Sequence, residues 1–171
     1  MEKNKTLKSY VYAGIVSLLL TLLDQYTKYL AVVHLKGKPA FPLLSGVFEL
    51  QYLENRGAAF GLFQDKQLFF MLGAALIFLI VLYFYAKIPH SKRYYLMRVY
   101  AVLIVSGALG NMIDRLRFEY VVDFFYFSLI DFPIFNVADC YVVIGCILFA
   151  FSLLFYYSEE ELSCFSISKR T

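Results

Sequence analysis

The sequence predicts an all-α membrane protein with four transmembrane helices, and three observations carry this prediction. First, 61% of the 171 residues are hydrophobic and only 17% are charged, whereas soluble domains have about 45–50% apolar and about 25% charged residues. Second, four apolar stretches are each long enough to cross about 30 Å of hydrocarbon. Third, residues 87–98, between the second and third stretches, are basic and contain no acid, which is typical of a cytoplasmic loop.

The four predicted spans form one polytopic membrane domain over residues 1–171, and we expect it to be a monomer. The first stretch lacks the short apolar core and small-residue cleavage site of a signal peptide, so it is predicted to remain as a helix. The N-terminal segment, which contains Lys3, Lys5 and Lys8, is also basic. By the positive-inside rule, both termini are therefore expected in the cytoplasm. The spans are predicted at residues 10–33, 67–86, 99–116 and 138–157.

Two segments between the spans have a different character. Residues 35–66 form a small outer loop in which Gly and Pro residues break any helix. Within this loop, residues 48–52 alternate between apolar and polar side chains, a period that predicts a half-buried strand. Residues 117–137 are rich in aromatic residues but are interrupted by acids and a proline. We expect an interfacial, partly helical segment there, before the last helix, because aromatic rings favour the headgroup level.

Several classes of function are excluded by composition. A net charge of +3 is too small and too scattered to predict nucleic-acid binding, and loops facing an anionic leaflet account for the basic residues. The three cysteines form no CxxC motif, there is no HExxH motif, and His34 and His90 stand far apart. We therefore expect neither a metal nor a cofactor. No serine or cysteine has a histidine placed to activate it as a nucleophile.

The acidic residues are the strongest functional signal, because an ionisable group at or inside a bilayer costs free energy. Asp123, between two valines and two phenylalanines, has no partner nearby in the sequence. Asp139 has a structural alternative, since with Asn136 it could simply cap the fourth helix. Asp114 beside Arg115 could form a plain ion pair, and Asp131 near a proline resembles a turn residue.

Asp24 and Lys28 are four residues apart and therefore share a helical face. They could form an ion pair that eases membrane insertion, or they could shape the site, and the sequence leaves both interpretations open.

Two carboxyl groups that share one proton can hydrolyse a peptide bond without a metal, because like charges a few Å apart cannot both ionise. We predict that Asp123 and Asp139 form such a site at the outer face of the membrane. Asp139 lies at a helix N-terminus and should be the more readily ionised partner, with Asp123 carrying the proton more often. A proton-coupled transporter and a noncatalytic membrane scaffold are the alternatives.

The chain also resembles the lipoprotein signal peptidases, the type II signal peptidases of bacteria. Five segments carry the resemblance, in the order of the family and over nearly the whole chain. They are Asp24-Gln-Tyr-Thr-Lys28, Asn55-Arg-Gly-Ala-Ala-Phe-Gly61, Gly107-Ala-Leu-Gly-Asn-Met-Ile-Asp-Arg115, Val121-Val-Asp-Phe124 and Phe132-Pro-Ile-Phe-Asn-Val-Ala-Asp139.

The resemblance implies an aspartic endopeptidase of the bacterial cytoplasmic (inner) membrane, with its site toward the extracytoplasmic face. Its partners would be membrane lipids and diacylglyceryl-modified prolipoproteins, cut before the lipidated cysteine. By motif, Asp123 and Asp139 take the catalytic positions. Ser106 and Glu119 stand where the family often has glycine, which puts the local backbone geometry in question. The supporting or substrate-binding positions are Asp24, Lys28, Asn55, Gly57, Gly107, Asn111, Asp114, Arg115, Asn136 and Ala138.

Overall fold

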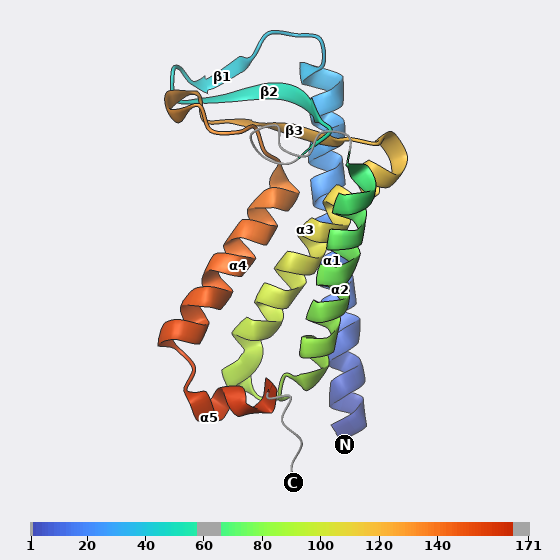
Figure 1. Cartoon of the computed structure of the whole chain (residues 1–171), viewed down its shortest axis with the longest axis vertical. Helices are drawn as coiled ribbons and strands as arrows, with labels where there is room; N and C mark the ends of the chain where they lie inside the picture. Colours follow the sequence, from blue (N-terminus) through green and yellow to red (C-terminus); the bar gives the residue numbers. More distant parts are fainter. Residues whose placement is uncertain (1, 58–65, 166–171) are drawn as a thin grey trace.

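Four long helices stand side by side, and a small sheet covers one end of them (Figure 1). The computed structural model describes residues 2–57 and 66–165. Within these ranges, four helices are long and apolar enough to cross a membrane. They are α1 (Glu2–Leu35), α2 (Gln67–Lys87), α3 (Tyr95–Phe118) and α4 (Val137–Phe155).

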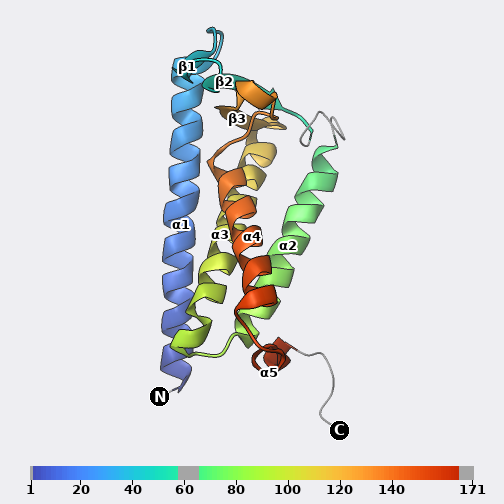
Figure 2. The same cartoon turned by 90° about the vertical axis from the view of Figure 1, so that its left-hand side faces the viewer.

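The helices agree with the four predicted spans, although α1 begins before residue 10 and α3 before residue 99. Their outward surface is apolar, with large side chains such as Leu19, Leu79 and Leu154 exposed. A continuous exposed apolar surface of this size marks contact with a membrane. Figure 2 shows α1 and α2 on opposite sides of the bundle, with α3 and α4 between them.

The described residues form one antiparallel sheet in the order β1-β2-β3. Its strands are β1 (Phe41–Leu44), β2 (Phe48–Asn55) and β3 (Val121–Tyr126). The strand predicted at residues 48–52 is confirmed and is three residues longer. The sequence did not predict β1, because Pro42 was taken only as a breaker. Proline is tolerated there because β1 is an edge strand, where a missing N–H leaves no ladder bond unmade.

The segment predicted to be interfacial and partly helical is extended over much of its length, which corrects that expectation. Residues 121–126 are a strand paired to β2, with Leu53 opposite Asp123. Only a single 3-10 turn, η3 (Ser128–Ile130), lies between β3 and α4. The four residues Val121 to Phe124 are all buried, so β3 lacks the apolar–polar alternation that announces a half-buried strand. Asp131 does lie in a turn, at φ 47°.

Two apolar clusters lie at opposite ends of the bundle. The cluster below the sheet contains Ala31, Val122 and Phe124. The cluster at the other end gathers Tyr85, Ile88, Met97 and Tyr157, together with side chains of α5 (Glu159–Leu162) and of the 3-10 helix η4 (Ser163–Phe165). A further 3-10 helix, η2 (Lys92–Tyr94), leads into α3.

Small residues let α3 approach α4 closely. A Cβ atom added at Gly107 would lie 2.3 Å from the Ala138 carbonyl oxygen, and one at Gly145 would lie 2.9 Å from the Ile104 side chain. Both distances are shorter than ordinary van der Waals contact, so neither position has room for a side chain. This close approach brings the N-terminal end of α4 against the polar side chains of α3.

Candidate active site

The largest fully buried side chains of the described residues are polar, and most of them meet where the helices join the sheet. They are Asn136, Asp24, Asp114, Asp123 and Ser106. Burying a charge is costly unless it is paired or hydrogen-bonded. A protein that places three carboxyl groups in its interior therefore has to surround them with donors.

Asp123 lies on β3 and is 1% exposed. Its carboxylate accepts a hydrogen bond of 2.8 Å from Asn55 Nδ2 on β2 and one of 2.6 Å from Asn136 Nδ2 at the start of α4. Burial, and after it the negative charge of Asp139, raise the pKa of Asp123 from 3.8 to about 7, while the two amide donors act in the opposite direction. This carboxyl group can thus hold a proton near neutral pH.

Asp139 lies in the first turn of α4, where the predicted capping arrangement is present. Asn136 is the N-cap: its side-chain oxygen accepts from Asp139 N at 3.0 Å, and its own N–H donates to Asp139 Oδ2 at 3.1 Å. Asn111 Nδ2 on α3 donates to the other oxygen, Oδ1, at 2.7 Å. The capping role that competed with a functional role for Asp139 is therefore real, but it occupies only one of its two oxygens.

Three asparagine side chains turn their NH₂ groups toward the two carboxylates, because each amide oxygen is occupied by a donor. Gly57 N donates to Asn55 Oδ1 at 2.9 Å, and Lys28 Nζ donates to Asn111 Oδ1 at 2.9 Å. Asp139 N donates in the same way to Asn136 Oδ1. When the amide oxygen accepts a hydrogen bond on one side, the NH₂ group of the same side chain must face the other side. Asn136 thereby contacts Asp123 with its side chain and Asp139 with its backbone.

Lys28 lies behind this arrangement as a buried cation between two acids. Its Nζ is 2.9 Å from Asp24 Oδ2 and 3.0 Å from Asp114 Oδ2, and its side chain is 4% exposed. The predicted Asp24–Lys28 ion pair is confirmed, and the same ammonium group also reaches Asn111. Lys28 thus lies between two buried acids and also contacts the amide that faces Asp139, so the geometry is compatible with both interpretations of the pair.

The alternative interpretation of Asp114, a plain ion pair with Arg115, is wrong. Adjacent residues on a helix do not face each other, and Asp114 points toward α1 instead. There it pairs with Lys28 and accepts a 2.8 Å hydrogen bond from Gln25 Nε2, while its other oxygen accepts from Val122 N at 3.2 Å. Asp114 therefore ties α1, α3 and β3 together.

Asp24 fixes the start of α4 relative to α1. Its Oδ1 accepts a 2.9 Å hydrogen bond from Ala138 N, one of the helix N–H groups that have no partner within the helix. Gly110 lies against the same carboxylate, where a Cβ atom would be 2.5 Å from Asp24 Oδ2. The glycine therefore leaves room for the carboxylate of Asp24.

Arg115 points away from Asp114 into a cavity next to the two aspartates. Its Nη2 donates to the Gly57 carbonyl oxygen at 3.3 Å, and its guanidinium carbon lies 4.6 Å from the centre of the Phe70 ring. Its Nε is buried and has no hydrogen-bond partner among the described residues. A guanidinium group held by a ring and a backbone carbonyl keeps donors that could serve a further acceptor.

The cavity has a volume of about 560 Å³. Asp123, Asp139, Asn111 and Arg115 form one part of its wall, whereas Phe70 and residues of α4 such as Val143 form an apolar part. Two carboxyl groups, a buried cation nearby and an apolar wall suit the hydrolysis of a bond within an apolar molecule. No group of three or more His, Cys, Asp or Glu side chains with metal-site geometry occurs in the described residues.

The structure thus brings eleven of the twelve predicted positions to this region. Gly107 is the remaining one and acts one turn away, through the α3–α4 contact. Two residues of the site, Gln25 and Phe70, were not singled out from the sequence. Gln25 could have been, because an amide inside an apolar helix needs a partner, but nothing distinguished Phe70 among many phenylalanines. The end of the motif that begins at Asn55, from residue 58, lies outside the described residues.

Comparison with known proteins shows to which family this arrangement belongs. The family model described as signal peptidase (SPase) II matches residues 16–155, which run from within the first span to the end of α4 and include the polar cluster. The chain belongs to the signal peptidase II family.

Individual relatives of the signal peptidase II family agree along the length of the chain. The lipoprotein signal peptidase of Caldanaerobacter subterraneus subsp. tengcongensis is 40% identical over 144 residues, which cover 84% of this chain and 96% of that protein. The lipoprotein signal peptidase of Streptococcus pyogenes serotype M5 is also 40% identical over 144 residues, covering 84% and 91%.

Two solved structures, each described as a bacterial membrane enzyme, have the same architecture. One has a TM-score of 0.74 at 30% identity and covers 94% of both chains. The other has a TM-score of 0.72 at 32% identity, covering 85% of this chain and 94% of its own. Membership of the signal peptidase II family makes this chain a multi-pass inner-membrane peptidase that removes signal peptides from bacterial prolipoproteins.

The structure shows the surroundings of Glu119 and Ser106, the two residues that stand where the family often has glycine. Glu119 ends α3 with φ 64°, in the left-handed region, where glycine is favoured because it has no Cβ. Ser106 is fully buried and donates hydrogen bonds to the Val102 carbonyl oxygen and to Ser17 Oγ. The expected disturbance therefore exists at Glu119, whereas the hydroxyl at Ser106 is accommodated.

Proposed function

We propose that this signal peptidase II acts as an aspartic endopeptidase, with Asp123 and Asp139 as its catalytic pair. Its substrates are diacylglyceryl-modified prolipoproteins, and it cuts just before the lipidated cysteine. One observation carries the proposal: Asp123 and Asp139, from a strand and a helix, are bridged by Asn136 at the wall of one cavity. That arrangement is what two-carboxylate activation of water requires.

The surroundings assign different roles to the two acids. Asp139 accepts N–H donors at both oxygens in the first turn of a helix and lines the cavity. It is the general base, and takes a proton from the water that attacks the scissile carbonyl. Asp123, with its pKa raised to about 7, is the general acid and supplies a proton to the departing nitrogen. The proton that Asp139 took from the water then passes to Asp123, which returns both carboxyl groups to their starting protonation.

The cavity wall suits a lipid-modified peptide. Phe70 on α2 and Val143 and Ile144 on α4 line it with apolar surface, and both helices have membrane-spanning character. The acyl chains of the substrate remain in the bilayer while its backbone reaches the acids, and Arg115 holds a substrate carbonyl with its free donors. The outer loop, residues 35–66, clamps the substrate from above, although residues 58–65 lie outside the described structure.

The proposed orientation places the sheet and the cavity on the extracytoplasmic side and both termini in the cytoplasm. The basic segment between α2 and α3 supports it, since positive charge is retained in the cytoplasm. In this orientation the site faces the side where the lipidated cysteine of an inserted precursor lies.

The decisive experiment is a gel-shift assay of a diacylglyceryl-modified precursor. Asp123→Asn and Asp139→Asn keep the size of each side chain but remove the carboxyl group that gives or takes a proton, and each should lower the cleavage rate by a factor of about 10²–10⁴. Asp131→Asn, the same change at the exposed turn acid after η3, is the matched control and should cleave normally. Wild-type cleavage by either dyad variant would show that the pair is not catalytic.

A further inference from the structure

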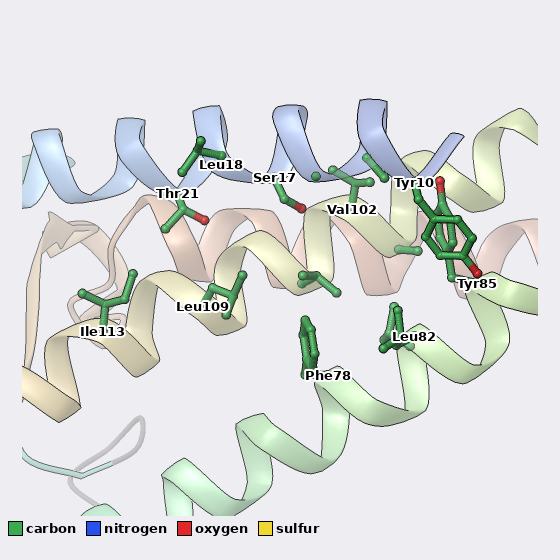
Figure 3. A pocket seen from close by; sticks show the side chains of 15 residues that line it. Tyr10, Ser17, Leu18, Thr21, Phe78, Leu82, Tyr85, Val102, Leu109 and Ile113 are labelled. Atoms are coloured by element: carbon green, nitrogen blue, oxygen red, sulfur yellow. The ribbon is translucent and has the colours of Figure 1, made fainter. Parts of the chain in front are cut away.

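A second cavity lies between α1, α2 and α3, within their membrane-spanning lengths. Its volume is about 450 Å³, within the range of about 300–1,000 Å³ typical of sites for small molecules. Figure 3 shows side chains of all three helices around it, with Leu18 on α1, Phe78 on α2 and Leu109 on α3. This cavity shares no lining residue with the candidate active-site cavity. We call it the α1–α3 groove, because residues of α1, α2 and α3 line it.

The wall of the α1–α3 groove offers mainly apolar contacts, because Ser17, Thr21 and Tyr85 already have hydrogen-bond partners outside the lining. Ser17 accepts a hydrogen bond from Ser106 Oγ at 3.2 Å, and Thr21 Oγ1 donates to the Ser106 carbonyl oxygen at 3.4 Å. The Tyr85 hydroxyl is 3.0 Å from Ser9 Oγ. Apolar cavities stay free of water and take up apolar molecules. At this depth in a bilayer, the apolar molecules at hand are lipid chains.

The groove has the length of one acyl chain within one leaflet. It extends along α1 from Tyr10 to Thr21, a distance of about 16 Å at about 1.5 Å per residue. Half of a hydrocarbon core of about 30 Å is about 15 Å. The rings of Tyr10 and Tyr85, with centroids 5.3 Å apart, close the end away from the sheet, and tyrosine is the residue expected at headgroup level.

Positive charge gathers at this tyrosine end. The Arg98 guanidinium carbon lies 5.9 Å from the centre of the Tyr85 ring, and its Nη2 donates to the Ile88 and Pro89 carbonyl oxygens. Lys8 is exposed two residues before Tyr10, and Lys87 follows Tyr85 by two residues. Residues 6–23 and 67–113, which contribute every lining residue, contain no Asp or Glu. The nearest acidic run is on α5, where Glu161 is paired with Arg93. Within these two ranges an anionic headgroup therefore meets positive charge and no carboxylate.

We propose that the α1–α3 groove binds one acyl chain of an anionic phospholipid, with its phosphate among Lys8, Lys87 and Arg98. The second acyl chain remains in the surrounding bilayer. This site is separate from the proposed peptidase chemistry, so either can be refuted without the other.

Tryptophan fluorescence tests the proposal directly, because the chain contains no tryptophan. Leu82→Trp places a reporter at the groove, and Leu79→Trp places one on the same helix at an exposed position that does not line it. Both are reconstituted in phosphatidylcholine bilayers with a small fraction of brominated phosphatidylglycerol or brominated phosphatidylcholine. At Leu82→Trp, brominated phosphatidylglycerol should quench with at least threefold higher apparent affinity. At Leu79→Trp the two lipids should quench equally, and equal quenching at both positions overturns the proposal.

Gly14 allows the groove to be filled without strain. A Cβ atom added there meets no described heavy atom within 4 Å, so Gly14→Leu should fold normally. In the Leu82→Trp background it should remove the preference for phosphatidylglycerol. Gly73→Leu is the matched control, since Gly73 is equally open but does not line the groove.

The charge requirement is tested separately. Lys8→Gln together with Lys87→Gln should lower the preference at least threefold. If the preference survives Gly14→Leu, the lipid binds elsewhere. If light scattering instead shows a dimer that Gly14→Leu dissociates, a second copy of the chain fills the groove, and the lipid proposal is wrong.

Discussion

At the scale of single residues, the site depends on the orientation of three amides. Lys28 can only donate hydrogen bonds, so its contact with Asn111 Oδ1 forces Asn111 Nδ2 toward Asp139. The Gly57 and Asp139 backbone N–H groups orient Asn55 and Asn136 in the same manner. The two carboxylates are therefore surrounded by amide donors, and the oxygen of each amide is held by another N–H group. This explains why asparagine, and not a second acid, occupies these positions.

Removal of the buried cation should be costly. In Lys28→Met, Asp24 and Asp114 keep their charge without a counter-ion, and the free energy of unfolding should fall by about 3–5 kcal/mol. The matched control is Lys36→Met, which breaks the exposed pair with Glu54 and should change stability little. Unfolding in detergent, followed by circular dichroism, measures both. Equal losses for the two variants would contradict the role of Lys28.

The raised pKa of Asp123 predicts how stability depends on pH. The folded state keeps a proton on Asp123 up to about pH 7, whereas the ordinary pKa is 3.8. Between these values the folded state binds more protons, so the free energy of unfolding should fall as pH rises, by at most about 1.4 kcal/mol per pH unit. The contribution is complete below the ordinary value and is lost as pH rises through 7.

The comparison of pH 5 with pH 8 isolates this contribution. Asp123→Asn should reduce the difference in stability between the two pH values, while Asp131→Asn should not alter it. An unchanged difference in Asp123→Asn would mean that the folded protein does not hold the proton there.

At the scale of elements, the end of α3 carries a strained residue. Glu119 has a left-handed backbone at the position after the helix, which costs a residue with a Cβ about 1–2 kcal/mol relative to glycine. Glu119→Gly should therefore raise the free energy of unfolding by about 1 kcal/mol. Glu119→Ala is the control, because it removes the carboxylate but keeps the Cβ, and it should bring no gain. A gain of the same size in Glu119→Ala would assign the effect to charge.

At the scale of the whole molecule, the three buried acids and the half-buried Asp139 gather at one end of the bundle. Asp24, Asp114, Asp123 and Asp139 all lie near the sheet. A proton-coupled transporter would instead need acids near the middle of several spans, so the distribution favours a site at one membrane face.

The proposed orientation is tested by chemical labelling. In a variant without the native cysteines, Ser45→Cys, in the exposed turn between β1 and β2, should react with a membrane-impermeant maleimide in intact cells. Ser91→Cys, exposed between α2 and α3, should react only after the cells are opened. The opposite pattern would invert the topology.

The helices could be predicted from the sequence because a span is a local property of about 20 apolar residues. The capping role of Asn136 was also local, since its partner is three residues away. The strand at residues 121–126 was missed because its buried pairing depends on β2, which is distant in sequence. For the same reason Asp114 was assigned to Arg115 and not to Lys28: the sequence shows neighbours along the chain, whereas helix packing decides which neighbours meet.

The donors around the two aspartates come from β2, α3 and α4, and the lysine behind them comes from α1. During biosynthesis these parts enter the membrane one after another, and residues 136–139 enter last among them. A nascent chain, or any fragment that ends before α4, therefore lacks Asn136 and Asp139 and cannot assemble the proposed pair.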